Sequence, residues 1–280
     1  MNISGVCYMN IKHKAVAHAM DFESIYDYSD YYKIDENQNV WKYMDLEKFQ
    51  SLLDNRALFF AKPGAFIDPL EGSYSQWDIE RLGGNVHTRE EMREIQEHAA
   101  ISCWHTNDHE SAGMWDLYLN SKDGVAIKTD YIRLINSIND LRYRIFTAKI
   151  QYIDFSSEMT SINIFDTLFF KRKSFSHEKE LRLLTIAGSI ERYLGMKFER
   201  EGLEYEEIVE KIEEIEKDSF RFSNSNGNFV SCDLSKMIQS IYVSPNSSDK
   251  IVTKVKQMVS NSGLNTNIVT QSDLYKDYIY

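Results

Sequence analysis

Residues 99–130 read AAISCWHTNDHESAGMWDLYLNSKDGVAIKTD, and this stretch decides the expected fold. Its apolar segments 100–104 and 125–129 have the composition of buried strands. Between them, residues 112–119 (AGMWDLYL) follow polar residues that suit a helix N-cap, and the Lys-Asp-Gly sequence at 122–124 indicates a turn. The stretch therefore predicts a strand, a short helix, a turn and a second strand.

The same reasoning extends to both sides of this stretch. Further strands are expected at residues 40–44, 57–63, 143–154, 177–188, 238–245 and 264–271, and helices at 46–55, 131–141, 162–175 and 249–263. These elements do not follow a regular β-α-β rhythm, so the predicted fold is α+β, with mixed, mostly antiparallel sheets and flanking helices. Neither a GxGxxG nor a GxxxxGK[ST] motif is present, so Rossmann and P-loop nucleotide sites have no support.

The sequence divides into an N-terminal arm at 1–38 and a single α+β domain of catalytic type at 39–280. The arm is acidic and rich in tyrosine, and it is either loosely held or folds on a partner or over the active site. Residues 76–100 are polar and look like a helical insertion or a lid. Residues 201–218 are expected to form a strongly acidic helix, which is either solvated or a partner-binding face.

The composition of the chain excludes several classes of protein. The chain has 280 residues, a net charge of −11 and three cysteines, too few for a disulfide framework. No apolar run reaches the roughly 18–20 residues of a membrane helix, and the N-terminus lacks the pattern of a signal peptide. We therefore expect a cytoplasmic protein with no membrane partner. The acidic balance disfavours general coating of nucleic acid, but it permits a small local groove.

The segment around residue 180 carries the first candidate for chemistry. If residues 177–188 form a strand, then Glu178, Glu180 and Arg182 lie on one face, because side chains alternate along a strand. Two carboxylates and a guanidinium on one face suit acid–base work or the stabilisation of a cation. The alternative is a surface strand with a Glu–Arg pair.

Several other polar and aromatic residues admit two interpretations. Cys103, His105 and His109 are metal-ligating types, but their spacing matches no strong zinc pattern, so no metal is expected and Cys103 reads as a buried apolar residue. Asp68 and Glu71 are either turn formers or residues that position a substrate. The aromatic residues Trp41, Tyr43, Trp104, Trp115 and Tyr118 are core residues or, beside a strand end, stack on a ring of a ligand.

The motifs together carry a resemblance. In order they are WKYMD, FFAKPGAFIDPLEG, SCWHTNDHESAGMWDLY, GVAI and KxxxFxHEKELRLL. This arrangement, over roughly residues 40–275, resembles an uncharacterised bacterial defence-associated domain family, whose members often lie near phage-defence genes. More distantly, it resembles the ADP-ribosyltransferase superfamily, which implies an ADP-ribosyltransferase-like core and NAD as co-substrate.

The resemblance assigns roles to residues. Lys42 and Tyr43 correspond to the first superfamily motif, Ser102 to the second, and Glu178 and Glu180 to the Glu-x-Glu of the third. It implies that Glu180 binds the ribose 2′-hydroxyl and stabilises the positive charge that develops as nicotinamide leaves, while Glu178 orients or deprotonates the acceptor.

The remaining cofactor contacts follow from the same resemblance. Tyr43 and Trp104 are expected to stack on nicotinamide, Ser102 to contact ribose, and His105 to join the site. Arg182 is expected to bind a phosphate or to orient Glu180. The motifs lack the usual Arg or His of the first strand, and Arg182 is an addition to the superfamily pattern.

The expected function is NAD-dependent ADP-ribosylation of RNA, DNA or protein by a toxin or anti-phage effector, with an inhibitor protein as a further partner. Two alternatives stay open. One is a nuclease that uses the carboxylates with His105, His109 and Arg182. The other is a non-catalytic sensor of a phage component or nucleotide.

Overall fold

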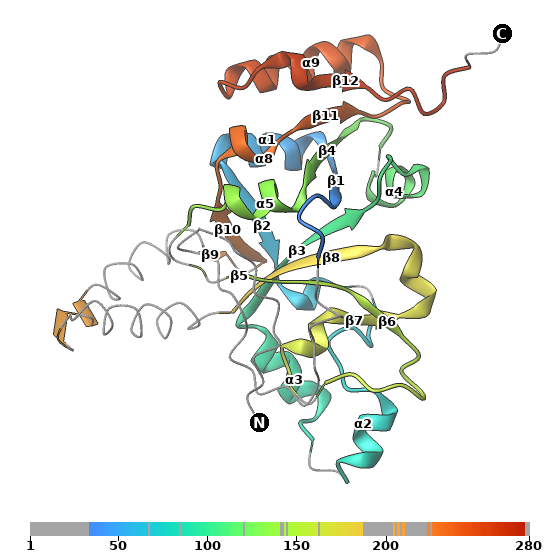
Figure 1. The fold of residues 1–280 in the computed structure, drawn as a ribbon, viewed down its shortest axis with the longest axis vertical. Helices are drawn as coiled ribbons and strands as arrows, with labels where there is room; N and C mark the ends of the chain where they lie inside the picture. Colours follow the sequence, from blue (N-terminus) through green and yellow to red (C-terminus); the bar gives the residue numbers. More distant parts are fainter. Residues whose placement is uncertain are drawn as a thin grey trace. The chain divides into compact units, whose positions relative to one another are not determined.

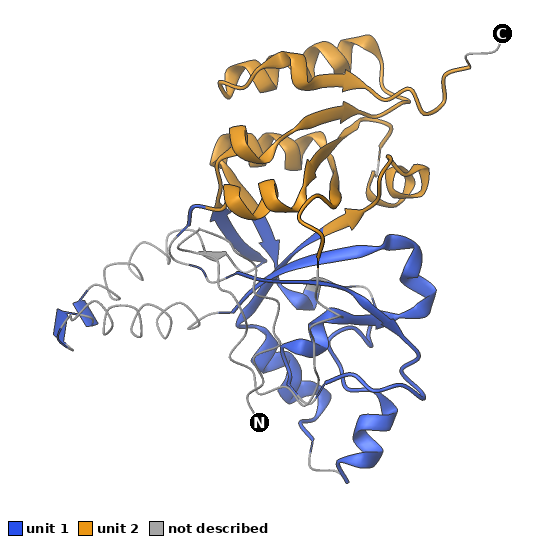
Figure 2. Ribbon diagram, viewed as in Figure 1, with its two compact units in different colours: residues 1–33, 59–103, 139–230 blue, residues 34–58, 104–138, 231–280 orange. Residues whose placement is uncertain are grey.

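The computed structural model describes residues 34–277 apart from 67, 84–85, 120, 141–142, 144, 162, 187–203, 205, 208, 211–222 and 225. Within this part of the chain, the protein is α+β, with mostly antiparallel strands and flanking helices (Figure 1). It divides into two compact units, shown in separate colours in Figure 2. The described part of unit 1 falls within 59–103 and 139–230, and that of unit 2 within 34–58, 104–138 and 231–277.

Unit 2 contains an antiparallel sheet with one parallel pair at its end. The strand order is β12 (Val269–Gln271), β11 (Ser240–Val243), β4 (Gly124–Asp130), β1 (Asn39–Asp45) and the end of β3 (Ala99–Thr106). β1 and β4 pair along their whole length, from Asn39 opposite Asp130 to Asp45 opposite Gly124. Only β11 and β12 run parallel within this unit's described strands.

The helices predicted in unit 2 begin at the predicted residues, but the one expected at 131–141 ends at Ser137, and the strand expected at 264–271 is a 3-10 helix followed by the short β12. Asp45 caps α1 (Leu46–Asn55) by accepting a hydrogen bond from the Lys48 backbone N–H at 2.8 Å. The apolar face of α1 is buried, and the helix ends at Arg56 in the left-handed region. The other helices of the unit are α4 (Ala112–Tyr118), α5 (Tyr131–Ser137), α8 (Leu234–Met237), α9 (Asp249–Asn261) and the 3-10 helix η4 (Thr266–Ile268). The predicted strand–helix–turn–strand at 99–130 is confirmed.

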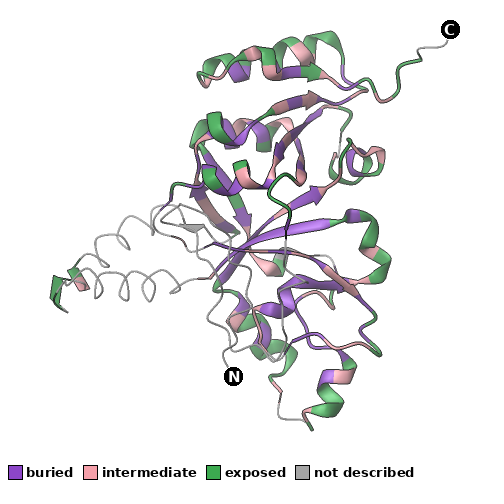
Figure 3. Ribbon diagram, viewed as in Figure 1, coloured by how far each residue is buried: buried purple, intermediate pink, exposed green. Residues whose placement is uncertain are grey.

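Unit 1 has its own run of paired strands. Their order is β5 (Ile145–Lys149), β8 (Glu180–Ile186), residues 99–103 of β3, β2 (Ala57–Ala61), β10 (Gly227–Ser231) and β9 (Ser223–Asn224). A separate parallel pair is formed by β6 (Gln151–Ile153) and β7 (Phe170–Arg172). β8 is buried along nearly its whole length (Figure 3), so any charged residue on it lies away from water.

The predicted helix at 162–175 is wrong. The structure has a 3-10 helix η2 (Asp166–Phe169), strand β7 and a second 3-10 helix η3 (Lys173–Glu178). The Asn163 side chain accepts from the Phe165 backbone N–H at 2.9 Å, which is a local turn that competes with helix. Consecutive residues 166–171 are all buried, whereas an amphipathic helix would bury only one face.

Two predicted strands also differ from the structure. The strand expected at 143–154 divides into β5 and β6, because the Ile150 backbone N–H donates to the Glu180 carbonyl and β6 then pairs with β7. The strand expected from 177 begins only at Glu180. Lys179 has φ 41°, a left-handed conformation that a strand does not contain.

The polar segment at 76–100 holds two short helices, α2 (Gln76–Arg81) and α3 (Arg89–Gln96), each with a capping box. In α2 the buried Asp78 also accepts hydrogen bonds from the backbone and hydroxyl of Thr160, which anchor the helix to a distant loop. Residues 1–33 of the predicted arm, and most of the predicted acidic helix at 201–218, lie outside the described residues. None of the described helices is both long enough and apolar enough to cross a membrane.

Candidate active site

Glu180 and Arg182 form a buried ion pair on β8. Being two residues apart on a strand, they share one face. The Arg182 Nε donates to Glu180 Oε1 at 2.7 Å, and Nη2 donates to Oε2 at 3.2 Å. The residues are only 4% and 1% exposed. The prediction that these two side chains share a face is confirmed, and the alternative of a surface pair is wrong.

Lys171 from β7 brings further carboxylates to this pair. Its Nζ lies 2.6 Å from Glu178 Oε2, 3.4 Å from Glu180 Oε2 and 3.8 Å from Glu71 Oε2. The ammonium also lies 4.9 Å from the centre of the Phe175 ring. We call Glu71, Lys171, Glu178, Glu180 and Arg182 the charged cluster. All five belong to unit 1, with three carboxylates against two cations.

Glu71 reaches the cluster from a tight turn. Its carboxylate forms an ion pair with Arg182, and the turn is closed by a 3.1 Å hydrogen bond from the Glu71 N–H to the Asp68 carbonyl. Asp68 in turn accepts from Arg172 Nε at 2.9 Å. Each end of this turn is therefore fixed by an ion pair, and Asp68 and Glu71 form a turn and also position charges.

Arg182 is fully engaged inside the protein. Besides both glutamates, it donates from Nη1 to the Leu168 carbonyl, and its guanidinium lies 4.8 Å from the centre of the Phe66 ring. The second of the two roles expected for Arg182, to orient Glu180, fits these contacts. Binding of a ligand phosphate would break them.

Two residues outside the cluster fix Glu180 further. The Glu180 backbone N–H donates to the Tyr152 hydroxyl at 2.8 Å. The Cys103 thiol interacts with the Glu180 carboxylate. Cys103 is half-buried rather than buried as expected, and it has this polar contact in addition to its packing against apolar residues.

The environment separates the proton affinities of the two carboxyls that contact Arg182. Burial alone would raise the pKa of Glu180, but the charge and hydrogen bonds of Arg182, with Lys171, outweigh burial and lower it to about 2. Burial raises the pKa of Glu71, and attraction by Arg182 and Lys171 does not reverse the shift. Glu180 is therefore a permanent anion at neutral pH, and Glu71 is the more easily protonated of the two.

The turn that carries Glu71 depends on a glycine. Gly72 has φ 74°, and a Cβ placed there would lie 2.8 Å from Gln96 Oε1 and 3.0 Å from Leu168 Cδ2. Gln96 itself is held, since its Nε2 donates to the Gly72 carbonyl at 2.7 Å. The turn therefore tolerates neither the backbone strain nor the volume of a side chain.

We predict that Gly72→Ala lowers the free energy of unfolding by about 2–3 kcal/mol, since strain and overpacking add. Gly83→Ala is the matched control, because Gly83 has φ 60° but no atom lies within 4 Å of the place that the new methyl group would occupy. The control should lose only about 1 kcal/mol from strain. Urea unfolding of both variants measures the difference, and equal losses would contradict the prediction.

The structure places two of the predicted site residues differently from the prediction. Glu178 does not share the strand with Glu180: it ends η3, and the left-handed Lys179 separates the two. Ser102 is on the opposite face of β3 from Cys103, and Cys103 packs on the same core as Leu184, which shares the β8 face with Glu180. The structure therefore places Ser102 and the Glu180 carboxylate on opposite faces of this sheet.

The residues predicted to hold nicotinamide lie in unit 2 and on two faces. The Tyr43 ring lies 6.3 Å from His105 and 5.0 Å from Trp115, between ring centres. Lys42 lies 5.3 Å from the centre of the Trp104 ring. Since Lys42 and Tyr43 are successive strand residues, Tyr43 and Trp104 lie on opposite faces and do not flank one nicotinamide.

The Tyr43 hydroxyl has a structural contact, accepting from the Ser111 backbone N–H at 2.8 Å. Burial raises the pKa of this hydroxyl. Tyr43, Trp41, Trp115, Met114 and Ala126 together form a buried apolar cluster. The core interpretation is confirmed for Trp41, Tyr43, Trp104 and Trp115, but it is wrong for Tyr118, which is 37% exposed.

The chain matches no known protein family, no curated protein and no solved structure. A function therefore has to be inferred from the geometry of the chain itself. Within the described ranges, no three His, Cys, Asp or Glu side chains are grouped so that they could hold a metal ion. Neither Lys171 nor Tyr152 was a predicted site residue, although Lys171 and Phe175 are the first two fixed positions of the KxxxF motif.

Proposed function

We propose that the charged cluster is the catalytic centre of an NAD-dependent ADP-ribosyltransferase that modifies a macromolecule. The observation that carries the proposal is Glu180, a carboxylate held ionised in a buried site by Arg182. Loss of nicotinamide places positive charge on the ribose, and a fixed anion in a water-poor site stabilises that charge where it develops.

The residues of the cluster fit two steps of this reaction. The bond between the ribose C1′ and nicotinamide breaks, and the leaving nicotinamide takes the bonding electrons and becomes neutral. Glu180 stabilises the ribose cation until a nucleophilic oxygen or nitrogen of the acceptor attacks C1′. Glu71 is suited to take the acceptor's proton, because its raised pKa makes it the stronger base of the two glutamates.

The remaining members of the cluster position these two carboxylates. Lys171 contacts Glu178 most closely, so that Glu178 holds the ammonium between the other glutamates. Arg182 orients Glu180. Since Glu180 is only 4% exposed, a substrate reaches it only when a covering segment moves.

This part of the proposal does not use Tyr43, Trp104 or Ser102, because Tyr43 and Trp104 lie on opposite faces of their sheet and Ser102 lies on the opposite face of β3 from Cys103, which contacts Glu180. It keeps the role of toxin or anti-phage effector, with an inhibitor protein as partner, as a property to be tested in cells.

The test is release of nicotinamide and transfer of label from radiolabelled NAD to cellular RNA, DNA or protein. We expect Glu180→Gln to lower both rates by about 10²–10³-fold, because it removes the charge that stabilises the ribose cation. Glu94→Gln, which removes an exposed carboxylate from α3, should leave them unchanged. Circular dichroism and urea unfolding of each variant check that it is folded.

Three outcomes would contradict the proposal. The first is a folded wild-type protein that neither releases nicotinamide nor transfers label to any of the three acceptors. The second is a Glu180→Gln variant with unchanged rates or unchanged toxicity on expression. The third is cleavage of nucleic acid without NAD, which would identify the alternative nuclease.

A further inference from the structure

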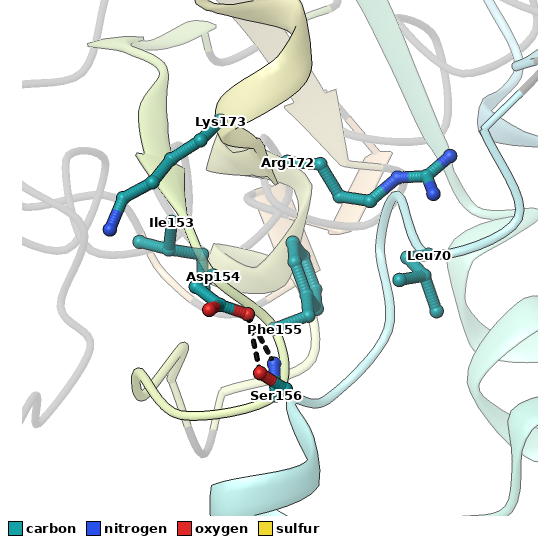
Figure 4. Close-up of a pocket in the computed structure, with 7 residues that line it drawn as sticks. All are labelled: Leu70, Ile153, Asp154, Phe155, Ser156, Arg172 and Lys173. Carbon is teal, nitrogen blue, oxygen red and sulfur yellow. Dashed lines mark hydrogen bonds between the residues drawn. The ribbon is translucent and has the colours of Figure 1, made fainter.

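A pocket of about 340 Å³ lies in unit 1, and its seven lining residues are labelled in Figure 4. Leu70, Ile153 and Phe155 provide the apolar part of the lining. Ile153 and Phe155 pack with Phe170 in a buried cluster, and Leu70 packs against that cluster. This volume falls in the range of about 300–1,000 Å³ that is typical of small-molecule pockets.

Two cations line the same pocket. The Arg172 side chain is 42% exposed and is held by Asp68, whose own side chain is 1% exposed. Asp68 accepts from Nε at 2.9 Å and contacts Nη2 at 2.8 Å, so it occupies one edge of a guanidinium that has five N–H donors. Lys173 is 60% exposed and forms an ion pair with Glu158. Arg172 is therefore a preoriented fork of the kind that binds phosphate.

A carboxylate gives the pocket a second polar end. Asp154 accepts from the Ser156 backbone N–H at 2.9 Å and from its hydroxyl at 2.6 Å. In Figure 4 the Arg172 guanidinium and Leu70 lie to one side of the Phe155 ring, and Asp154 and Lys173 lie to the other. A ligand that satisfies both sides has an anionic group at Arg172 and an N–H donor at Asp154, with an apolar or aromatic body between them.

We infer that this pocket binds a nucleotide-sized group, an amino-bearing purine or pyrimidine ring that carries a phosphate. The ring lies against Leu70, Ile153 and Phe155, the phosphate accepts from Arg172, and the amino group donates to Asp154. None of the seven lining residues belongs to the charged cluster. The inference therefore does not rest on the proposed transferase function, and binding can be measured without NAD.

The test is the dissociation constant of AMP, measured by isothermal titration calorimetry on the full chain. AMP should bind at least tenfold more tightly than adenosine or inorganic phosphate, since each of these makes only part of the contacts. Arg172→Lys keeps the charge that Asp68 needs but removes the fork, and it should weaken AMP binding about tenfold. Arg89→Lys, an exposed arginine of α3, is the matched control and should bind as wild type does.

Lys173→Gln provides a second variant, because Lys173 is exposed and its loss should leave folding intact. Because Lys173 lies on the Asp154 side of the Phe155 ring, away from the phosphate at Arg172, its loss should leave AMP affinity within about twofold of wild type. A single-stranded oligonucleotide with a 5′-phosphate distinguishes the source of the ligand: tenfold tighter binding than AMP identifies a nucleic-acid end, and equal binding identifies a free nucleotide. The inference is overturned if AMP binds no more tightly than phosphate, or if Arg172→Lys leaves the affinity for AMP unchanged.

Discussion

Arg182→Met is expected to lower the free energy of unfolding by about 3–5 kcal/mol. Arg182 is 1% exposed and is bonded to Glu180, Glu71 and the Leu168 carbonyl. Methionine fills similar space but provides no charge, so Lys171 alone would have to compensate three buried carboxylates. The loss should be measured by urea unfolding at neutral pH, followed by circular dichroism.

The control for this prediction is Arg89→Met, which removes an exposed arginine and should change stability by less than about 0.5 kcal/mol. A second comparison tests the cause. If uncompensated negative charge is responsible, then adding Glu71→Gln to Arg182→Met should restore part of the loss, since the two changes are coupled. The explanation is wrong if Arg182→Met unfolds at the same urea concentration as Arg89→Met.

Acid should remove a large contribution of Glu180 to stability. The pKa of Glu180 is lowered from 4.5 to about 2 in the folded protein, so the folded state binds this proton less readily than the unfolded state. The stabilisation is fully present above about pH 5 and is lost as the pH falls toward 2, with a maximum of about 3 kcal/mol. Glu71 opposes this, because burial raises its pKa and the folded state takes up its proton more readily.

The measurement is the free energy of unfolding of wild type and Glu180→Gln between pH 7 and pH 2.5. The difference between the two proteins should shrink steadily below about pH 5, because glutamine has no proton to gain. Glu94→Gln, an exposed change, should stay parallel to wild type over the whole range. A constant difference between wild type and Glu180→Gln would show that Glu180 is not held ionised by the fold.

The parts of the fold that sequence predicted are those where local signals and packing agree. The helix at 46–55 was predicted from an aspartate N-cap and an apolar face. In the structure the aspartate caps the helix and the apolar face is buried. Strands β3 and β4, with α4 between them, follow directly from the apolar and turn residues at 99–130. In these segments the secondary structure that the local sequence favours is the same as the one that packing in the sheet stabilises.

The parts that sequence could not predict depend on contacts with distant residues. The composition of residues 165–172 does not distinguish a helix from a strand; in the structure Asp166–Phe169 form a 3-10 helix, and Phe170–Arg172 become a strand by pairing with β6. Glu180 and Arg182 could be paired from sequence because they lie two residues apart on one strand. Lys171 and Glu71 reach them from other segments of the chain. The spacing of residues in the sequence therefore does not predict the charged cluster. The faces occupied by Ser102 and Trp104 likewise required the sheet register.

The left-handed residue Lys179 makes the Glu-x-Glu motif a corner instead of a straight strand. With this corner in place, both glutamates lie close to the Lys171 ammonium, at 2.6 and 3.4 Å. Valine or isoleucine at 179 would resist that backbone geometry, whereas glycine or asparagine would adopt it readily. A Glu-x-Glu sequence grafted into another protein would therefore also need the left-handed residue between the two glutamates. On a regular strand, the same two glutamates would not surround one ammonium group as they do here.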